Sequence, residues 1–333
     1  MRRGRIVAVL AAACVVLIGS GLHRDGRARA QGATANYPLY PVKIVVPYPA
    51  GSIPDTLGRM IGDQLQTQLG KPVVIENRPG ASTLLGAKAV ASAEPDGYTL
   101  LIPTVTTLSI APQLNPKTGV DPVNDFTPLA RLGGTNFFLV VGASFPARTM
   151  REWIDEVKRN PGKYRYASAG IGTPHHIFME LLKKQFGLDI THVPYKGSVE
   201  AMPDLLGGRV DMSFLDGSQA VTYIKSGQLR ALGTSMAKQT NLVEGVPPIS
   251  ATVPGFDWSG WILMAGPRGM PKPVVDRIAA QVAALQATPR FAETLRTALM
   301  EPMPLLSPDQ TAVFVREEYQ RWKDVIKLSG AAE

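Results

Sequence analysis

Short apolar runs and amphipathic helical segments alternate along most of this chain. Residues 43–48, KIVVPY, form a run rich in β-branched side chains. The segment that follows places four apolar side chains on one helical stripe, which Gly70 ends: Leu57, Ile61, Leu65 and Leu69. Continuous apolar strands that alternate with helices are typical of parallel or mixed sheets covered on both faces. The chain is therefore predicted to fold in the α/β class.

Two strand-like runs divide the chain into three parts. They are residues 137–142, FFLVVG, and residues 261–267, WILMAGP. If both runs cross between two lobes, the first and last thirds of the chain form one lobe and the middle third forms the other, with a closable cleft between them. We predict a discontinuous lobe 1 of residues 36–141 plus 263–333, a lobe 2 of residues 142–262, and hinge strands in the two crossing runs.

The first 30 residues predict a secretory signal peptide. Three arginines near the N-terminus precede an apolar run over residues 6–22, and Ala28-Arg29-Ala30 has the small-x-small pattern of a cleavage site. The alternative is an N-terminal membrane anchor, but this run is short and wrongly flanked for a membrane span. Export of this kind predicts a protein of the bacterial periplasm.

The same segment explains the apparent basic character of the chain. It holds six of the 35 basic residues and one of the 27 acidic residues, so its removal lowers the formal charge from +8 to +3. No basic block remains, and this argues against a nucleic-acid partner. The only cysteine, Cys14, lies in the removed part. The mature chain would therefore have no disulfide, thiol nucleophile or thiolate metal site.

In open α/β sheets, ligands bind beyond the carboxyl ends of the strands, so the strand-to-helix turns are candidate sites. The first turn, PYPAGSIPD, contains Gly51, which allows a close approach of the backbone, and is followed by a helix start that favours an anion. Asp55 would satisfy some of the free amides itself or receive an ammonium group. The alternative is a capped turn without a ligand.

The second turn, residues 166–177, has the sequence YASAGIGTPHHI. Thr173 fits the N-cap of a helix and Pro174 its first position. The hydroxyl groups of Ser168 and Thr173, with the amides of the turn around Gly170 and Gly172, could surround a carboxylate. His175 and His176 point about 100° apart on a helix, so they do not form a metal-binding pair, and surface or packing roles are the alternative.

Three further turns carry polar side chains. Tyr195 and Lys196 precede a helix and could reach an anionic ligand, although a solvated lysine is an equal alternative. Asp216 could contact an ammonium or hydroxyl group, or cap the next helix. The turn after residues 98–102 offers threonine hydroxyls that suit a polar ligand or ordinary turn hydrogen bonds: Thr104, Thr106 and Thr107.

Taken together and in order, these segments resemble the solute-binding proteins of the tripartite tricarboxylate transporter system, the Bug or TctC-like family. The resemblance covers about residues 40–290 and rests on KIVVPYPAGSIPDTLGR, LGKPVVIENRPGA, PDGYTLL, NPGKYRYASAGIGTPHH, THVPYKGSVEAMPDLLGGRVD, IKSGQLRALGTS and PKPVVDRI. It implies an α/β fold of the two-lobe periplasmic-binding-protein type II (Venus flytrap) kind. It also implies a carboxylate ligand: a dicarboxylate, a tricarboxylate, an acidic amino acid or an aromatic acid.

The resemblance further implies which residues bind the carboxylate. In lobe 1 it points to Tyr48, Ala50, Gly51, Ser52 and Asp55, and in lobe 2 to Ser168, Gly170, Gly172, Thr173, His176, Tyr195 and Gly197. Thr104, Thr106 and Asp216 complete the predicted site. The chain departs from the family pattern at several positions of these turns: Ser52, Pro54, Ser82, Thr83, Leu108 and Leu215.

Three functions remain to be distinguished. The first is capture of a small carboxylate by closure of two lobes, for delivery to a membrane permease of this transporter system or presentation to a sensor kinase. The second is a periplasmic hydrolase with Ser168 or Ser198 as nucleophile and a histidine as base, although no G-x-S-x-G motif is present. The third, an effector domain of a transcription regulator, lacks an N-terminal DNA-binding motif. We expect a monomer without catalytic residues, cofactor or metal.

Overall fold

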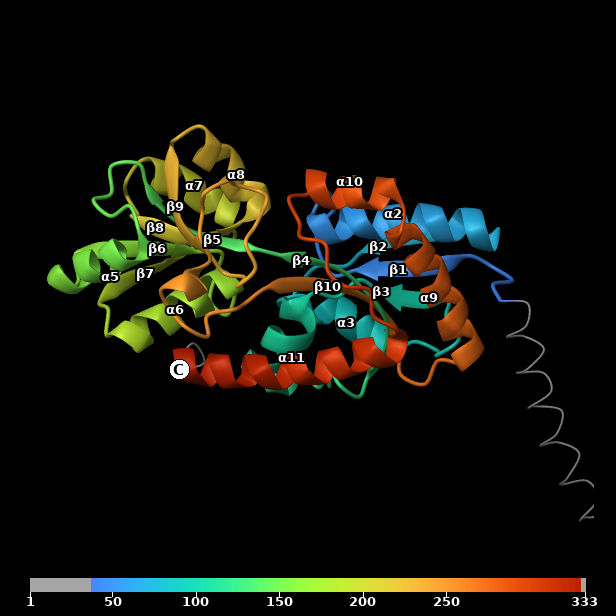
Figure 1. Cartoon of the computed structure of the whole chain (residues 1–333). Coiled ribbons are helices and arrows are strands. Elements are labelled where there is room, and N and C mark those ends of the chain that lie inside the picture. Colours follow the sequence, from blue (N-terminus) through green and yellow to red (C-terminus); the bar gives the residue numbers. More distant parts are fainter. Residues whose placement is uncertain (1–36, 331–333) are drawn as a thin grey trace, which may run out of the picture.

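The computed structural model describes residues 37–330, and the predicted signal peptide lies outside these residues. The described chain forms two five-stranded sheets, each with its own helices, which lie side by side as two lobes (Figure 1). None of the described helices is long and apolar enough to cross a membrane. The predicted α/β class and two-lobe architecture are confirmed.

Lobe 1 contains the sheet β2-β1-β3-β10-β4. Strands β1 (Val42–Val46), β2 (Val73–Asn77) and β3 (Thr99–Leu101) are parallel, whereas β10 (Gly260–Pro267) runs antiparallel to β3 and to β4 (Phe126–Thr135). The helices and helical turns of lobe 1 before β4 are α2 (Ile53–Leu69), α3 (Leu84–Ala91), η1 (Thr106–Ile110), α4 (Ala111–Leu114) and η2 (Pro116–Thr118). After β10 come α9 (Lys272–Gln286), α10 (Pro289–Thr297) and α11 (Pro308–Ser329).

Lobe 2 contains the sheet β7-β6-β8-β5-β9. Strands β6 (Tyr164–Ser168), β7 (Ile190–Pro194) and β8 (Met212–Asp216) are parallel, and β5 (Phe137–Gly142) is antiparallel to β8 and β9 (Leu229–Thr234). Its helices are α5 (Met150–Arg159), α6 (Pro174–Phe186), α7 (Ser198–Leu206), α8 (Gly217–Lys225) and the short turn η3 (Ile249–Ala251).

Helix α2 illustrates why these segments fold as the sequence predicts. Leu57, Ile61 and Leu65 of its apolar stripe are buried and Leu69 is partly buried. Pro54 occupies the first turn, and Gly70 ends the helix in the left-handed region with φ of 69°. The Gly70 amide donates to the carbonyl oxygen of Gln66 at 3.0 Å, which satisfies one of the last carbonyl groups of the helix.

The two crossings between the lobes differ from the predicted positions. The first crossing is at Asn136, because β4 belongs to the lobe 1 sheet and all of β5 pairs within lobe 2. The second lies just before β10, because the segment around η3 still bonds to β9 of lobe 2, the Trp258 amide donates to the Ser235 carbonyl oxygen at 2.8 Å, and β10 begins at Gly260. The run at 137–142 therefore lies wholly in lobe 2, and the predicted boundary at residue 141 moves to Asn136. The run at 261–267 is a full strand of lobe 1.

Strand β4 was not predicted from the sequence. It contains Pro128 and the pair Gly133-Gly134, residues that disfavour a strand interior. Its pairing with β10 is interrupted by two register shifts, and the first falls where Gly133 pairs with Ile262. Long antiparallel pairing with a buried apolar partner outweighs the local preferences of these residues.

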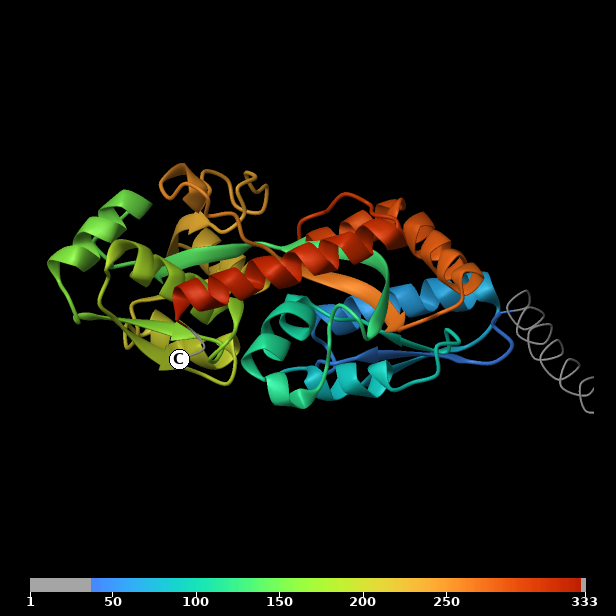
Figure 2. The same cartoon turned by 90° about the horizontal axis from the view of Figure 1, so that it is seen from below.

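Helix α11 is the other departure from the predicted lobes. It was expected within lobe 1, but it runs beneath both lobes (Figures 1 and 2). The ring of Trp322 in α11 lies 5.7 Å from that of Phe178 in α6 of lobe 2. The Glu318 carboxylate of the same helix accepts hydrogen bonds from the indoles of Trp261 at 2.8 Å and Trp322 at 3.1 Å. The last helix thus joins β10 of lobe 1 to the core of lobe 2.

Candidate functional site

The carboxyl end of β1 and the start of α2 lie on the side of lobe 1 that faces lobe 2 (Figure 1). Residues 47–52 connect the two elements. The first-turn amides of α2 have no partner inside the helix, and the positive end of the helix dipole lies at the same place. This turn can therefore hold an anion between the lobes.

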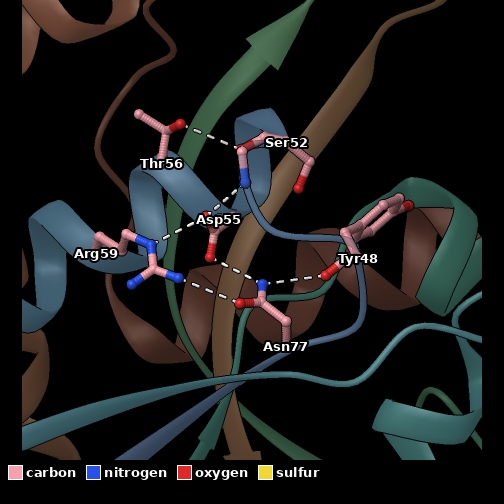
Figure 3. A network of polar contacts seen from close by, with 7 residues as sticks. Tyr48, Ser52, Asp55, Thr56, Arg59 and Asn77 are labelled. Atoms are coloured by element: carbon pink, nitrogen blue, oxygen red, sulfur yellow. Dashed lines mark hydrogen bonds and ion pairs between the residues drawn. The ribbon is translucent and has the colours of Figure 1, made fainter.

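Asp55 fixes the shape of this turn (Figure 3). Its carboxylate accepts hydrogen bonds from the Gly51 amide at 2.8 Å, Arg59 Nε at 3.0 Å and Asn77 Nδ2 at 2.8 Å. Burial alone would raise the pKa of Asp55, but the hydrogen bonds from Arg59, Gly51 and Asn77 outweigh it and lower the pKa. Asn77 Nδ2 also donates to the Tyr48 carbonyl oxygen at 3.1 Å, so the network joins both ends of the turn.

This network changes the role expected for Gly51. The resemblance places Gly51 among the residues that bind the carboxylate, but its amide donates to Asp55 inside the turn. Gly51 has φ of 82°, so its left-handed conformation gives the turn its shape. The neighbouring Ser52 hydroxyl is buried and has no hydrogen-bond partner among the described residues. Ala50 is exposed beside it.

Two threonines border the same turn. The Tyr48 and Thr104 hydroxyl groups are 2.6 Å apart, and Thr104 Oγ1 accepts from the Thr106 amide at 3.2 Å. Burial raises the pKa of Tyr48, and its hydrogen bonds with the threonines oppose that shift. Thr106 opens the π-helical segment η1, a type of distortion that occurs frequently at functional sites.

In lobe 2, the turn between β6 and α6 is held by its own side chains. Ser168 Oγ accepts from the Gly170 amide at 3.1 Å, and Thr173 Oγ1 donates to the Gly170 carbonyl at 2.7 Å. The Gly172 amide donates to His176 Nδ1 at 3.3 Å. The amides of both glycines are thus used within the turn. At the start of α6, Pro174 has no amide hydrogen and the His176 amide donates to the Thr173 carbonyl oxygen at 3.0 Å, so the His175 amide is the donor that remains.

The Ser168 hydroxyl and His192 Nε2 are 2.7 Å apart, which is the spacing of a nucleophile and its base. However, Ser168 is 1% exposed, and the His192 ring lies stacked between Tyr166 and His176. Burial and the neighbouring His176 lower the pKa of His192 to about 4, which makes it a poor base at neutral pH. The pair is suited to fixing the turn and not to hydrolysis.

Tyr195 was expected to face the ligand, but its hydroxyl donates to Asp204 of α7 at 2.6 Å. Burial and this carboxylate raise the pKa of Tyr195 to about 12. Gly197 has an extended backbone at the N-cap of α7. Lys196 is exposed and forms no ion pair within residues 37–330. The Tyr195 side chain therefore supports α7, and the backbone and the Lys196 ammonium group of this turn remain available to a ligand.

The two lobes touch at two of these turns. A Cβ atom added to Gly172 would lie 2.2 Å from Leu114 Cδ1 in α4, and one added to Gly217 would lie 2.7 Å from the Leu299 carbonyl oxygen. Leu114 is the last residue of α4, which directly follows η1 and the turn with Thr104 and Thr106. The predicted turns of lobes 1 and 2 thus border one common segment, residues 104–114.

Several contributors to the site escaped sequence reasoning. Asn77 lies at the end of β2, and Arg59 lies one helical turn after Asp55. Ala81, Ser82 and Thr83 all have positive φ, and the Thr83 hydroxyl is buried without a described partner at the start of α3. The departure from the family pattern at residues 82 and 83 was the available signal.

Two other features of the described chain lie apart from this site. A cavity of about 440 Å³ in lobe 2 is lined mainly by α8, β9 and the loop around Glu244, and it touches none of the predicted site residues. Within residues 37–330, no group of three histidine, cysteine, aspartate or glutamate side chains is placed to hold a metal ion.

Known proteins resemble this chain in sequence and in fold. Residues 57–331 match the family model described as "Tripartite tricarboxylate transporter family receptor". Protein BugT of Bordetella pertussis is 30% identical over 297 residues, covering 89% of this chain and 91% of that protein. An R. palustris protein solved with adipate has a TM-score of 0.78 and 32% identity, covering 88% of this chain and 98% of the other. MatC of Rhodopseudomonas palustris, with bound malate, has a TM-score of 0.74 and 32% identity, covering 87% of this chain and 100% of MatC.

Proposed function

The chain belongs to the tripartite tricarboxylate transporter receptor family, and from this premise we propose that it captures a small carboxylate in the periplasm by closure of its two lobes. Members of this family are solute-binding proteins, so the chain is a binding protein and not a hydrolase. Delivery of the ligand to a membrane permease of the same system is the second part of the proposal.

The observation that carries the proposal is the position of the two helix starts. Helix α2 of lobe 1 and α6 of lobe 2 each follow the carboxyl end of a parallel strand, and their turns border residues 104–114. The amides of Ile53 and Asp55 in α2 and of His175 in α6 have no backbone partner among the described residues, and each helix start adds a positive dipole end. A carboxylate between them would accept donors from both lobes only when they are closed. The ligand would therefore favour the closed state through its differential affinity.

In this proposal Ser52 contacts the carboxylate directly. Its hydroxyl is buried, lies at the start of α2 and has no described partner, so an unbound protein leaves a polar group unsatisfied there. A hydrogen bond from this hydroxyl to a carboxylate would contribute about 1.5–3 kcal/mol. The Thr106 hydroxyl and the amides of Ile171 and His175 are the remaining proposed contacts. Asp55, Tyr48 and His176 hold the turns in place.

Titration calorimetry with adipate and malate tests the proposal, since these are the acids bound by the two similar structures. We expect the Ser52→Ala variant to fold normally and to bind the better ligand about 10- to 100-fold more weakly. Thr67→Ala is the matched control, because that hydroxyl lies at the far end of α2 and donates to the Asp63 carbonyl. Undiminished affinity of Ser52→Ala would place the ligand elsewhere.

A further inference from the structure

Thr83 directly precedes α3 and is its N-cap residue. The residue is 7% exposed, and its hydroxyl has no hydrogen-bond partner among residues 37–330. An N-cap threonine ordinarily accepts a hydrogen bond from an amide of the first helical turn, but Thr83 makes no such bond. Buried polar groups in folded proteins are almost always satisfied. The Thr83 hydroxyl therefore needs a partner that the described part of the chain does not supply.

The turn before α3 has an unusual backbone. Three successive residues other than glycine have positive φ: Ala81 at 48°, Ser82 at 51° and Thr83 at 77°. This conformation is unfavourable for residues with a side chain, whereas glycine adopts it without strain. The amides of Ser82 and Thr83 donate to no backbone carbonyl of the described chain. Successive unpaired amides in a turn can together bind an anion, so the turn adds donors to the Thr83 hydroxyl.

The start of α3 lies at the edge of the lobe 1 sheet that carries the proposed carboxylate site. Strands β1, β2 and β3 are parallel, so α2 and α3 both begin at the carboxyl ends of these strands. The two helices lie on opposite faces of the sheet (Figure 1), and their apolar residues belong to two separate buried clusters. A Cβ atom added to Gly86 of α3 would lie 2.9 Å from Pro47 Cβ, and Pro47 begins the turn that leads to Ser52. The two helix starts therefore flank the carboxyl end of β1.

Residues 104–114 lie on the same face of the sheet as α3. Leu84 of α3 and Leu108 belong to one buried apolar cluster. Leu114, at the end of this segment, lies against Gly172 of lobe 2. The α3 side of the sheet edge therefore belongs to the region that lobe 2 approaches.

The charges around the start of α3 favour an anion. The first turn of α3 contains no acidic residue. On the adjoining strand β2, the Glu76 carboxylate is paired with Lys43 at 2.9 Å and lies 3.7 Å from Arg78, so its charge is compensated. The positive end of the α3 dipole lies at the same place as the unpaired amides. This set of groups suits an oxyanion better than an ammonium group.

We propose that Thr83 and the start of α3 form a second oxyanion subsite, which binds the far carboxylate of a dicarboxylate whose first carboxylate lies at Ser52. The inference rests on the proposed function. The Thr83 hydroxyl and the Ser82 amide are the donors of this subsite. The ligand spans the carboxyl end of β1, from the α2 side of the sheet to the α3 side. Thr83 is thereby a residue that selects acids with a second carboxylate.

The test compares acids whose far end is either a carboxylate or a methyl group: adipate with hexanoate, and malate with 2-hydroxybutyrate. Titration calorimetry on the full mature protein measures each affinity. We expect the wild-type protein to bind at least one dicarboxylate about tenfold or more tightly than its monocarboxylate partner. Thr83→Val removes the hydroxyl and keeps the branched shape of the side chain. It is expected to weaken binding of that dicarboxylate about tenfold and to leave the affinity for the monocarboxylate within about twofold.

Two further variants separate the hydroxyl from the packing of the side chain. Thr83→Ser keeps the hydroxyl and should bind the dicarboxylate within about threefold of the wild-type affinity. Thr83→Ala is a second variant without the hydroxyl and should behave as Thr83→Val does. Thr67→Val is the matched control, because it removes an exposed hydroxyl at the far end of α2, and it should leave every affinity unchanged.

The outcomes distinguish the subsite from the proposed function. If the wild-type protein binds each monocarboxylate as tightly as its dicarboxylate partner, the second subsite is overturned and the proposed carboxylate capture remains. Thr83→Val and Thr83→Ala variants that lose no affinity, or lose it equally for both acids of a pair, also overturn the subsite. If none of the four acids binds, both the subsite and the proposed function are refuted.

Discussion

Replacement of Asp55 by asparagine tests whether this carboxylate holds the first turn. The residue is 2% exposed, and its two oxygens accept three hydrogen bonds. Asparagine has the same shape but only one acceptor oxygen. If the asparagine oxygen accepts the hydrogen bonds from Gly51 and Arg59, the asparagine NH2 group points at Asn77 Nδ2, and both of these groups are donors. Rotation of the Asn77 amide does not help, because Nδ2 donates to the Tyr48 carbonyl and Oδ1 accepts from Arg59.

The cost of Asp55→Asn follows from these contacts. One donor-to-donor contact leaves buried groups unsatisfied, at about 1–3 kcal/mol. The Gly51 hydrogen bond becomes neutral and the Arg59 bond loses the charge of its acceptor, at about 0.5–1 kcal/mol each. The Arg59 side chain is half exposed, so solvent screens its share. We therefore expect a loss of about 2–4 kcal/mol in the free energy of unfolding at pH 7.

Urea unfolding at several pH values measures this loss. Because the pKa of Asp55 is lowered by folding, its stabilisation is present above the unfolded pKa of about 3.9 and is lost as the pH falls through the lower folded value. The gap between wild type and Asp55→Asn should thus narrow toward pH 3. Asp63→Asn, on the exposed side of α2, is the matched control and should cost less than about 0.5 kcal/mol. If the two variants are equally stable at pH 7, Asp55 does not anchor the turn.

Four further changes give measurable results. Gly172→Ala should weaken ligand binding in calorimetry and lower the free energy of unfolding in urea by about 1–3 kcal/mol, because the new methyl group meets Leu114. If neither quantity changes, the lobes do not touch at Gly172. Thr83→Gly should stabilise the protein by about 0.5–1 kcal/mol by relieving the positive φ of 77°, and a destabilised variant would contradict this. Folding lowers the pKa of His192 to about 4, so between pH 6.5 and 4 the unfolded state binds one more proton than the folded state. The free energy of unfolding should therefore fall as the pH falls through that range. In His192→Phe this fall in the free energy of unfolding should be smaller. Trp322→Ala should cost about 3–5 kcal/mol by denaturant unfolding, because the indole is fully buried, and a smaller cost would remove α11 from the shared core.

The parts of the fold that local sequence decides were predictable. Apolar runs bounded by glycine and proline gave the positions of β1, β5, β6 and α6, and glycine ended α2 in the left-handed region, as expected. Strand β4 escaped because its stability depends on β10, which lies more than a hundred residues later in the chain. A proline and two glycines oppose a strand locally, and only the long-range pairing overrules them.

The candidate site divides in the same way. The sequence indicated the strand-to-helix turns of the proposed site, because such connections are recognisable from residues such as Gly51 and Thr173. It did not reveal which donors are free. The Gly51 amide donates to Asp55, the Gly172 amide donates to His176, and the Tyr195 hydroxyl donates to Asp204. These pairings depend on side-chain directions that are fixed only by packing in three dimensions.

The position of α11 limits how the two lobes can move. Trp322 packs on Phe178 in lobe 2, and Trp261 of β10 donates to Glu318 of the same helix. A large rotation of lobe 2 away from lobe 1 would have to break the Trp322 contact or pull α11 from β10. Packed interiors tolerate little separation before contacts are lost. Opening is therefore expected to turn about Asn136 and the short link between Trp258 and Gly260, with α11 kept as the common edge. The start of α2 and the turn around Gly172 would then separate most.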